Sequence, residues 1–267
     1  MDIVLNDREF ALFQRMIYET AGIHMTSAKK ALVNGRLAKR IRHYGLKSYS
    51  DYFRMLSGPA GKAEFQVAVD LLTTNETYFF REQKHFDFLQ NTILPPLKGG
   101  RTVRIWSGAS STGEEIYTIA MVLAATLGTQ PWEVLGSDIS TRVLEQARAG
   151  HYPIERAENI PDEYLRKYCL KGVGDQEGSF LIDKALRART RFLQINLNAA
   201  LPKLDEFDVI FLRNVMIYFD MKTKQEVVAR IVRQLRSGGY FFVSHSESLN
   251  GITDQLKSVA PSIYRKP

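Results

Sequence analysis

Residues 103–115 read VRIWSGASSTGEE, an apolar run followed by a loop of small residues that ends in two acids. A short strand, a small-residue loop and the start of a helix form the usual cradle for a nucleotide in an α/β protein. This loop contains neither G-x-G-x-x-G nor G-x-x-x-x-G-K-[ST]. Glu114 and Glu115 would repel a phosphate at the helix start. The stretch therefore predicts an α/β fold whose ligand is not centred on phosphate.

The chain after residue 100 alternates strand patterns with helix patterns. Strands are predicted at residues 103–106, 132–136, 191–195, 207–212, 240–244 and 262–265, the last two as a pair. Helices are predicted at residues 113–127, 141–149 and 222–236, the last closed by Gly238 and Gly239. Such alternation is typical of a doubly wound, mostly parallel sheet with helices on both faces.

The first 75 residues show helical periodicity and no strand pattern. Asp7 is the predicted N-cap of a first helix that ends at Gly22. Further helices are predicted at residues 27–44, 48–55 and 61–72. This part is expected to be a small helical bundle, joined to the α/β part somewhere in residues 73–100.

Composition restricts the class of protein. The 267 residues are 45% hydrophobic and carry a net charge of +7, which fits a globular chain with an anionic partner. Cys169 is the single cysteine, so no internal disulfide can form, and a cytoplasmic location is expected. We expect no signal peptide and no membrane span. We also expect no metal site, because no Cys/His cluster has ligand spacing.

Polar residues follow three of the predicted strands. Asp138 stands roughly 20 residues after the loop, where an acid typically accepts hydrogen bonds from ribose hydroxyls. Asn196 ends the strand at 191–195, and Arg213 and Asn214 end the strand at 207–212. Together with the acidic end of the loop, they indicate an adenosine linked to a cationic group, as in S-adenosylmethionine. Stabilisation of the helix dipole is an alternative role for the two glutamates.

Four motifs carry a resemblance to a known family: TTNETYFFRE at 73–82, STGEE at 111–115, GSDIS at 136–140 and RNVMIYF at 213–219. In content and order they resemble the CheR family, the chemotaxis receptor glutamate methyltransferases. The resemblance spans nearly the whole chain. Ile116 replaces a frequent proline and Gly108 a usual alanine, and both departures are small.

This resemblance implies a class I S-adenosylmethionine-dependent methyltransferase fold, with a doubly wound, mostly parallel sheet and a C-terminal antiparallel strand. It also implies an all-helical docking domain at residues 1–75. The methyltransferase domain would cover residues 76–267, with a small β insertion at about 164–195.

The implied reaction transfers a methyl group from S-adenosylmethionine to glutamate side chains of bacterial chemoreceptors, leaving S-adenosylhomocysteine. The glutamyl methyl esters would serve chemotactic adaptation, a form of signal transduction. The enzyme would be a cytoplasmic monomer recruited to membrane receptor arrays, with no nucleic acid partner and no membrane insertion. The stretch KGVGDQEGSF at 171–180 resembles insertions that bind a receptor's C-terminal tail peptide, although an ordinary hairpin turn would also explain its glycines.

The resemblance also implies site residues. The implied cofactor contacts are Asn75, Thr77, Arg81, Glu115, Asp138, Asn196, Leu197, Arg213 and Asn214. Glu114 is the alternative to Glu115. Arg81 and Tyr218 are the implied catalytic residues, placed nearest the reacting centre. Otherwise, Arg81 would form a surface salt bridge with Glu82 or Glu76, and Tyr218 would be a core aromatic.

The predicted helix at 27–44 carries six basic residues and no acid between positions 29 and 42, in KKALVNGRLAKRIR. Helical spacing places an apolar stripe, formed by Val33, Leu37 and Ile41, against the core. Arg36, Lys39 and Arg40 should remain solvated beside it. With the family resemblance, they are expected to dock the acidic face of a receptor, although a charged helix face often has no partner.

Two other classes of function remain open at this point. An RNA methyltransferase would use the same cofactor loop with a basic domain, but only Tyr44 flanks the basic run as a stacking aromatic. A non-catalytic module that senses the cofactor would be expected to lose some residues of the pocket, and Arg81, Asp138 and Asn214 are all present.

Overall fold

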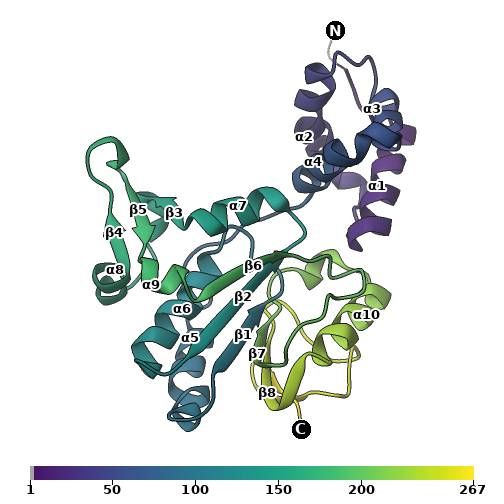
Figure 1. The fold of residues 1–267 in the computed structure, drawn as a ribbon. Coiled ribbons are helices and arrows are strands. Elements are labelled where there is room, and N and C mark those ends of the chain that lie inside the picture. The colour runs from purple at the N-terminus through teal and green to yellow at the C-terminus, as the bar shows by residue number, and fades with distance from the viewer. Residues whose placement is uncertain (1–2) are drawn as a thin grey trace.

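The computed structural model describes residues 3–267 as a helical bundle joined to a larger α/β part (Figure 1). The bundle consists of α1 (Asp7–Ala21), α2 (Lys30–His43), α3 (Tyr49–Leu56) and α4 (Lys62–Leu72), with 3₁₀ turns at Ser27–Lys29 and Pro59–Gly61. Asn6 is the N-cap of α1 and forms a capping box with Glu9, so the predicted N-cap, Asp7, is wrong by one residue. Gly22 ends this helix as predicted, in the left-handed conformation.

The bundle has its own apolar core. The predicted stripe of Val33, Leu37 and Ile41 on α2 is fully buried. Phe13 of α1 packs edge-on against Tyr49, with ring centroids 6.2 Å apart. These contacts explain why four short helices, each weak alone, form one stable unit.

The main sheet has seven strands in the order β6-β2-β1-β7-β8-β10-β9. Their bounds are β1 (Val103–Ser107), β2 (Trp132–Asp138), β6 (Thr190–Gln194), β7 (Phe207–Phe211), β8 (Leu235–Phe242), β9 (Lys257–Ala260) and β10 (Ile263–Arg265). The first five strands in this order are parallel, whereas β10 pairs antiparallel with β8 and with β9. The predicted doubly wound sheet with a C-terminal antiparallel strand is confirmed. The strand order reverses between β1 and β7, which places a ligand site at their carboxyl ends.

Helices cover both faces of the sheet. One layer contains α5 (Lys84–Phe88), a π-helical turn (Leu89–Ile93), a 3₁₀ turn (Pro95–Leu97) and α6 (Glu114–Leu127), and it packs against Ile105, Val209 and Phe211. The other layer contains α10 (Met221–Val232) and packs against Trp106, Ile210 and Phe241. Consecutive strand residues therefore face opposite layers, as strands buried on both sides require.

Two predicted boundaries in this part are wrong. The helix predicted at 222–236 ends at Val232, and Gly238 and Gly239 lie inside β8 instead of closing the helix. Gly238 has a φ of 77°, and the pairing of β7 with β8 shifts register beside these glycines. Glycine permits such a strand irregularity as readily as it ends a helix. Strand β9 was not predicted.

The insertion is a separate three-stranded antiparallel sheet in the order β3-β5-β4. It comprises β3 (His151–Pro153), a 3₁₀ turn (Ile154–Ala157), α8 (Asp162–Tyr168), β4 (Cys169–Lys171), a 3₁₀ turn (Gly174–Gln176), β5 (Ser179–Ile182) and α9 (Lys184–Arg187). The predicted range of 164–195 begins too late and ends too late, because β3 precedes it and β6 belongs to the main sheet. Strand β3 has three residues, one of them proline, so it shows no periodicity.

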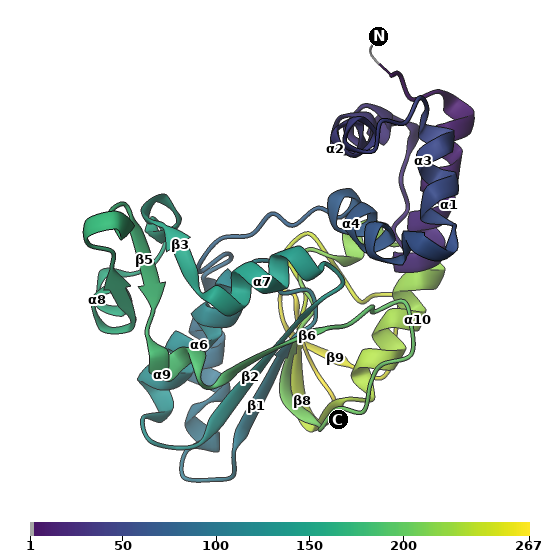
Figure 2. The ribbon, with the colours of Figure 1, turned by 45° about the horizontal axis from the view of Figure 1, so that its top comes forward.

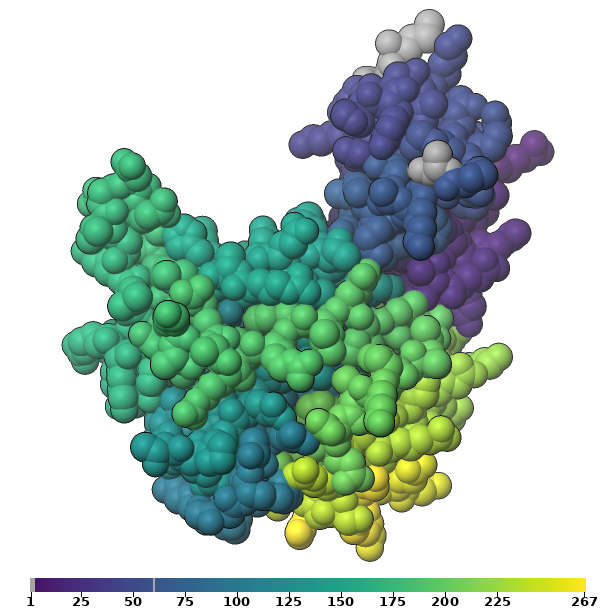
Figure 3. Space-filling view, viewed as in Figure 1, coloured from purple at the N-terminus to yellow at the C-terminus, as the bar shows by residue number. Residues whose placement is uncertain are grey.

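The bundle and the insertion stand on either side of α7 (Thr141–Ala149), with the bundle near α10 (Figure 2). The space-filling view shows a broad hollow between them, over α7 (Figure 3). An isolated bridge joins Ile23 to Phe219, and the Tyr18 hydroxyl donates to Asp220, so α1 is fixed to the start of α10. Within residues 3–267, every helix is too short or too polar to cross a membrane.

Candidate active site

A cavity lies at the carboxyl ends of β1, β2 and β7, where the strand order reverses. The empty space in it, counted together with its open mouth, is about 910 Å³. The bundle contributes Ala21 and Ile23 to its wall. All nine predicted cofactor contacts and Tyr218 also line the cavity, whereas Glu114 does not. The structure therefore brings together residues that are far apart in the sequence.

The loop after β1 is shaped by close backbone contacts. Gly113 has a φ of 96°, and a Cβ atom there would lie 2.9 Å from both Ala147 and Tyr152. Only glycine fits this position without rearrangement. The Ser111 backbone N–H donates to Asp138, and its hydroxyl donates to the carbonyl of Asn75. The loop is thus held between β2 and the 73–81 segment that closes over it.

Asp138 ends β2 and is almost completely buried. Burial raises the pKa of its carboxyl group, and hydrogen bonds from the backbone N–H groups of Ser140 and Ser111 oppose that effect. Each carboxylate oxygen accepts one of these bonds. Because a carboxylate can accept about four hydrogen bonds, Asp138 keeps capacity for two ligand hydroxyls.

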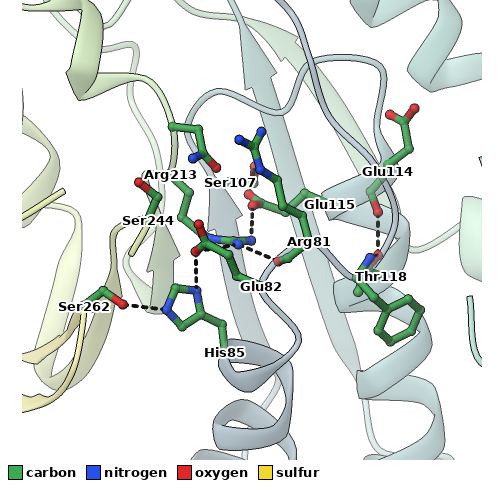
Figure 4. Close-up of polar contacts among 12 residues, drawn as sticks. Arg81, Glu82, His85, Ser107, Glu114, Glu115, Thr118, Arg213, Ser244 and Ser262 are labelled. Atoms are coloured by element: carbon green, nitrogen blue, oxygen red, sulfur yellow. Dashed lines mark hydrogen bonds and ion pairs between the residues drawn. The ribbon is translucent and has the colours of Figure 1, made fainter. Parts of the chain in front are cut away.

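Arg213 is the centre of a buried polar network (Figure 4). Its Nη1 donates to Glu115 over 2.8 Å, and its Nη2 donates to Glu82 over 3.0 Å and to the Arg81 carbonyl. The second Glu115 oxygen accepts from the Ser107 hydroxyl over 2.7 Å. The network fixes the Glu115 carboxylate at the cavity wall and partly neutralises its charge.

The two adjacent glutamates point in different directions (Figure 4). Glu114 is buried away from the cavity, where it accepts from the Thr112 hydroxyl and lies 3.4 Å from Arg156. Burial raises the pKa of its carboxyl group, with these neighbours acting in the opposite direction. Glu115, by contrast, lines the cavity. Glu114 is therefore placed to stabilise the start of α6.

The two predicted catalytic residues face the cavity from opposite segments. Arg81 donates to the carbonyl of Glu76, and its guanidinium group lies over the Tyr78 ring. Within residues 3–267, Arg81 forms no ion pair with Glu76 or Glu82, so the salt-bridge alternative does not describe its position. Tyr218 is half-buried at the cavity wall instead of being enclosed in the core.

Three of the remaining predicted contacts take part in structural hydrogen bonds. The Asn75 side chain accepts from the Thr73 hydroxyl, and the Thr77 carbonyl accepts from Arg156. The Asn196 amide donates to the Thr20 carbonyl at the end of α1, over 2.6 Å. The bundle therefore helps to position the cavity wall as well as forming part of it.

Glu82 was named only as a possible partner of Arg81, and its contact with Arg213 was missed. Its oxygen atoms lie within 4.8 Å of ring nitrogens of His85 and His245, an arrangement that resembles three metal ligands. Arg213 already pairs with this carboxylate, and burial together with Arg213 lowers the pKa of His85 to about 3. A second cation would be repelled there. The motif TTNETYFFRE contains Glu82, which was the available signal.

Two of the three predicted docking residues have internal roles. Arg40 forms a two-point ion pair with Glu64 of α4, which also accepts from the hydroxyls of Tyr44 and Tyr52. Arg36 donates to the Thr73 carbonyl over 2.9 Å, just after α4. The expectation that all three stay solvated is correct for the exposed Lys39, whereas Arg36 and Arg40 are only half-exposed and bind groups within the bundle.

A doubly wound sheet with a small-residue loop after β1, an acid at the end of β2 and a cavity at the point of strand reversal fits the class I S-adenosylmethionine-dependent methyltransferases. Residues 75–264 match the family model for the CheR methyltransferase, SAM binding domain. Residues 8–73 match the model for the CheR methyltransferase, all-alpha domain. The chain belongs to the CheR methyltransferase family.

Curated relatives agree over nearly the full length. The chain is 38% identical over 265 residues to the chemotaxis protein methyltransferase of Escherichia coli K12, covering 98% of this chain and 92% of the relative. It is 40% identical over 259 residues to chemotaxis protein methyltransferase 2 of Pseudomonas aeruginosa PAO1, covering 96% and 92%. The protein is thus an S-adenosylmethionine-dependent methyltransferase, as the resemblance implied.

Proposed function

We propose that the protein methylates glutamate side chains on the cytoplasmic helices of bacterial chemoreceptors, forming glutamyl methyl esters. The observation that carries the proposal is the convergence of the family's motif residues on one cavity. The names of the curated relatives, chemotaxis protein methyltransferases, support the choice of acceptor. S-Adenosylmethionine would be the donor and S-adenosylhomocysteine the product.

The cavity offers a partner for each part of the cofactor. Asp138 would accept from the ribose hydroxyls, and Glu115 would attract the ammonium group of the methionyl part. Asn196 and Leu197 would lie along the adenosine. Asn75, Thr77 and Arg81 would close the cavity from the 73–81 segment, and Arg213 and Asn214 from the end of β7.

The acceptor requires little activation. A glutamate side chain has an ordinary pKa of about 4.3, so it is a carboxylate at neutral pH and needs no general base. When bound, the cofactor supplies an electrophilic methyl group on a positively charged sulfur. Arg81 would orient the acceptor carboxylate by charge, and the Tyr218 hydroxyl would do so by hydrogen bonding. Catalysis would then depend mainly on positioning.

Transfer of labelled methyl groups from S-adenosylmethionine tests this proposal. Receptor-containing membranes and RNA are offered separately, and we expect label on the receptors that is released by mild base, as carboxyl esters are. Label on RNA instead would support the RNA methyltransferase. Binding of S-adenosylhomocysteine without transfer to either acceptor would support a non-catalytic module.

Receptor docking is proposed for the hollow between the bundle and the insertion, which is wide enough to expose α7 at its floor (Figure 3). Lys39 is exposed on α2 and would attract acidic residues around the methylation sites. We expect Lys39→Glu to raise the KM for receptor several-fold, most strongly at low salt, without changing affinity for S-adenosylhomocysteine. Lys257→Glu on β9 is the control. An unchanged KM would remove α2 from the interface.

A receptor tail peptide is proposed to bind the insertion. Strand β4 is an edge of its sheet, and Leu170 within it and Val173 just after it are 52% and 78% exposed. An edge strand can pair with an added peptide through its free backbone groups. Calorimetry should show heat when receptor tail peptides are titrated into the protein, and less heat with Leu170→Asp. Absence of heat would favour a simple hairpin. Binding would help recruit the enzyme, as a monomer, to receptor arrays.

A further inference from the structure

Glu247 lies in the turn after β8, and its carboxylate accepts four hydrogen bonds. One oxygen accepts from the backbone N–H groups of Asn214 and Ser244, each over 3.0 Å, and from the Ser244 hydroxyl over 2.8 Å. The other oxygen accepts from the backbone N–H of Ile217 over 3.2 Å. Glu247 itself does not line the cavity.

The backbone that Glu247 holds has an unusual shape. Asn214, three residues after the end of β7, adopts a φ of 58°, in the left-handed region. This turn directs the chain so that Arg213, Asn214 and Tyr218 all reach the cavity. Such a conformation persists only where surrounding contacts enforce it. Glu247 accepts the backbone N–H of Asn214 itself, and a carboxylate is a stronger acceptor than a neutral group.

The turn at 244–247 is also tied to the Arg213 network. The backbone N–H of His245 donates to Glu82 over 3.2 Å, and Glu82 in turn accepts from Arg213. Two glutamates on opposite sides thus fix the segment after β7 relative to the segment after β8. A shift of either segment would move Tyr218 and Asn214 together.

We infer that Glu247 is a positioning residue for methyl transfer, acting through the backbone of residues 214–217. The inference rests on the proposed function, which places Tyr218 at the reacting centre and Asn214 at the cofactor. Glu247 does not line the cavity, so it would act on the reaction only through this backbone. Its loss should therefore affect the alignment of the reacting groups more than the affinity for the cofactor.

Glu247→Gln tests the inference. The amide has a single oxygen, so its NH₂ group must face either the backbone N–H of Ile217 or the backbone N–H groups of Asn214 and Ser244, none of which can accept a hydrogen bond. We expect kcat to fall by on the order of tenfold, as small misplacements of reacting groups do, while the Kd for S-adenosylhomocysteine stays within about threefold. Asp254→Asn is the control, because it removes the same charge from an exposed side chain.

Ser244→Ala provides a second, milder test. It deletes one of the four hydrogen bonds without changing charge, and should lower kcat by about two- to threefold without unfolding the protein. This variant keeps the inference testable if Glu247→Gln does not fold. An unchanged kcat in the folded variants would overturn the inference. A loss of kcat matched by an equal loss of folded protein on thermal melting would also overturn it.

Tyr218→Phe separates this inference from the proposed function. If Tyr218→Phe leaves kcat unchanged, the assignment of Tyr218 to the reacting centre fails, whatever Glu247 does. If Tyr218→Phe lowers kcat and Glu247→Gln does not, only the positioning role of Glu247 is lost. A fall in kcat with both variants supports the two together.

Discussion

Arg213 acts as a buried counter-ion between two carboxylates. Its side chain is 1% exposed and pairs with both Glu82 and Glu115. Removing one member of such a buried set costs about 3–5 kcal/mol, because a charge is left without compensation. The acidic end of the loop is therefore less negative than its sequence indicates, and of its two glutamates only Glu115 lines the cavity.

The two adjacent glutamates give a matched pair of variants. We expect Glu115→Gln to weaken binding of S-adenosylhomocysteine by roughly 10- to 100-fold, because a charged contact at the cavity wall is lost and Arg213 loses a partner. Glu114→Gln should change the affinity less than threefold, because its carboxyl group lies outside the cavity. Isothermal titration of both variants measures the difference.

The same pair can also contradict the assignment. A larger loss of affinity in Glu114→Gln than in Glu115→Gln would place the ammonium group of the cofactor on the opposite side of the helix start. Equal small losses would mean that neither glutamate of the loop contacts that group. Circular dichroism of both variants shows whether each retains its fold.

Helix α2 has one feature that could be predicted from its own sequence and one that could not. Its apolar stripe was predicted from spacing alone, because burial follows from the period of the helix. The ion pair that Arg40 forms was not predicted, because its partner Glu64 lies on α4 and the pairing depends on how the two helices pack. Burial opposes ionisation of Glu64, but hydrogen bonds from Arg40, Tyr52 and Tyr44 dominate and lower the pKa of its carboxyl group.

Glu64 should make stability dependent on pH. An acid with a lowered pKa in the folded state stabilises the protein above its unfolded pKa, and this contribution is lost as pH falls through the folded pKa. We expect Glu64→Gln to lower the free energy of unfolding by about 2 kcal/mol at pH 7, because one amide cannot replace the carboxylate. The difference from the unsubstituted protein should shrink below about pH 4.5.

Urea unfolding between pH 7 and about pH 3 measures this difference. Glu163→Gln, an exposed substitution of the same kind on α8, is the control and should not alter the pH profile. A difference that grows on acidification would contradict the assignment. It would mean that the ionised form of Glu64 destabilises the folded bundle.

At the scale of elements, the alternation of strands and helices was predicted correctly because strand and helix periods differ clearly. The errors fall on short or irregular elements. Strand β3 exists because it pairs with β5, and Gly238 and Gly239 read equally well as the end of a helix or as a strand irregularity. Whether such a segment forms a strand depends on pairing with residues far away in the sequence, and a local sequence pattern does not show that pairing.

For the site, residues next to strand ends were predictable because the carboxyl ends of parallel strands converge at one edge. Asp138 and Asn214 are of this kind. Glu247 was not predictable, because it acts on a backbone turn more than 30 residues away in the chain. The orientation of Glu115 relative to Glu114 was also open until the helix start was placed.

At the scale of the molecule, α4 of the bundle caps a helix of the other part. The Asp70 carboxylate accepts from the backbone N–H groups of Thr141 and Arg142 and from the Thr141 hydroxyl. These groups form the start of α7, where a negative charge is favourable to the helix dipole. Because residues 73–81 leave α4 directly and line the cavity, this contact also sets where the cavity wall begins.

Asp70→Asn should loosen the bundle from the methyltransferase part. Both tryptophans, Trp106 and Trp132, lie in the main sheet, so their fluorescence reports the α/β part alone, whereas far-ultraviolet circular dichroism reports helices of both parts. In the unsubstituted protein we expect the two urea transitions to coincide. In Asp70→Asn the dichroism midpoint should move below the fluorescence midpoint, with about 1–2 kcal/mol of stability lost.

Asp175→Asn, exposed on the insertion, is the control and should leave the two transitions coincident. Coincident, unshifted transitions in Asp70→Asn would mean that the other contacts of α1 and α4 suffice to couple the two parts.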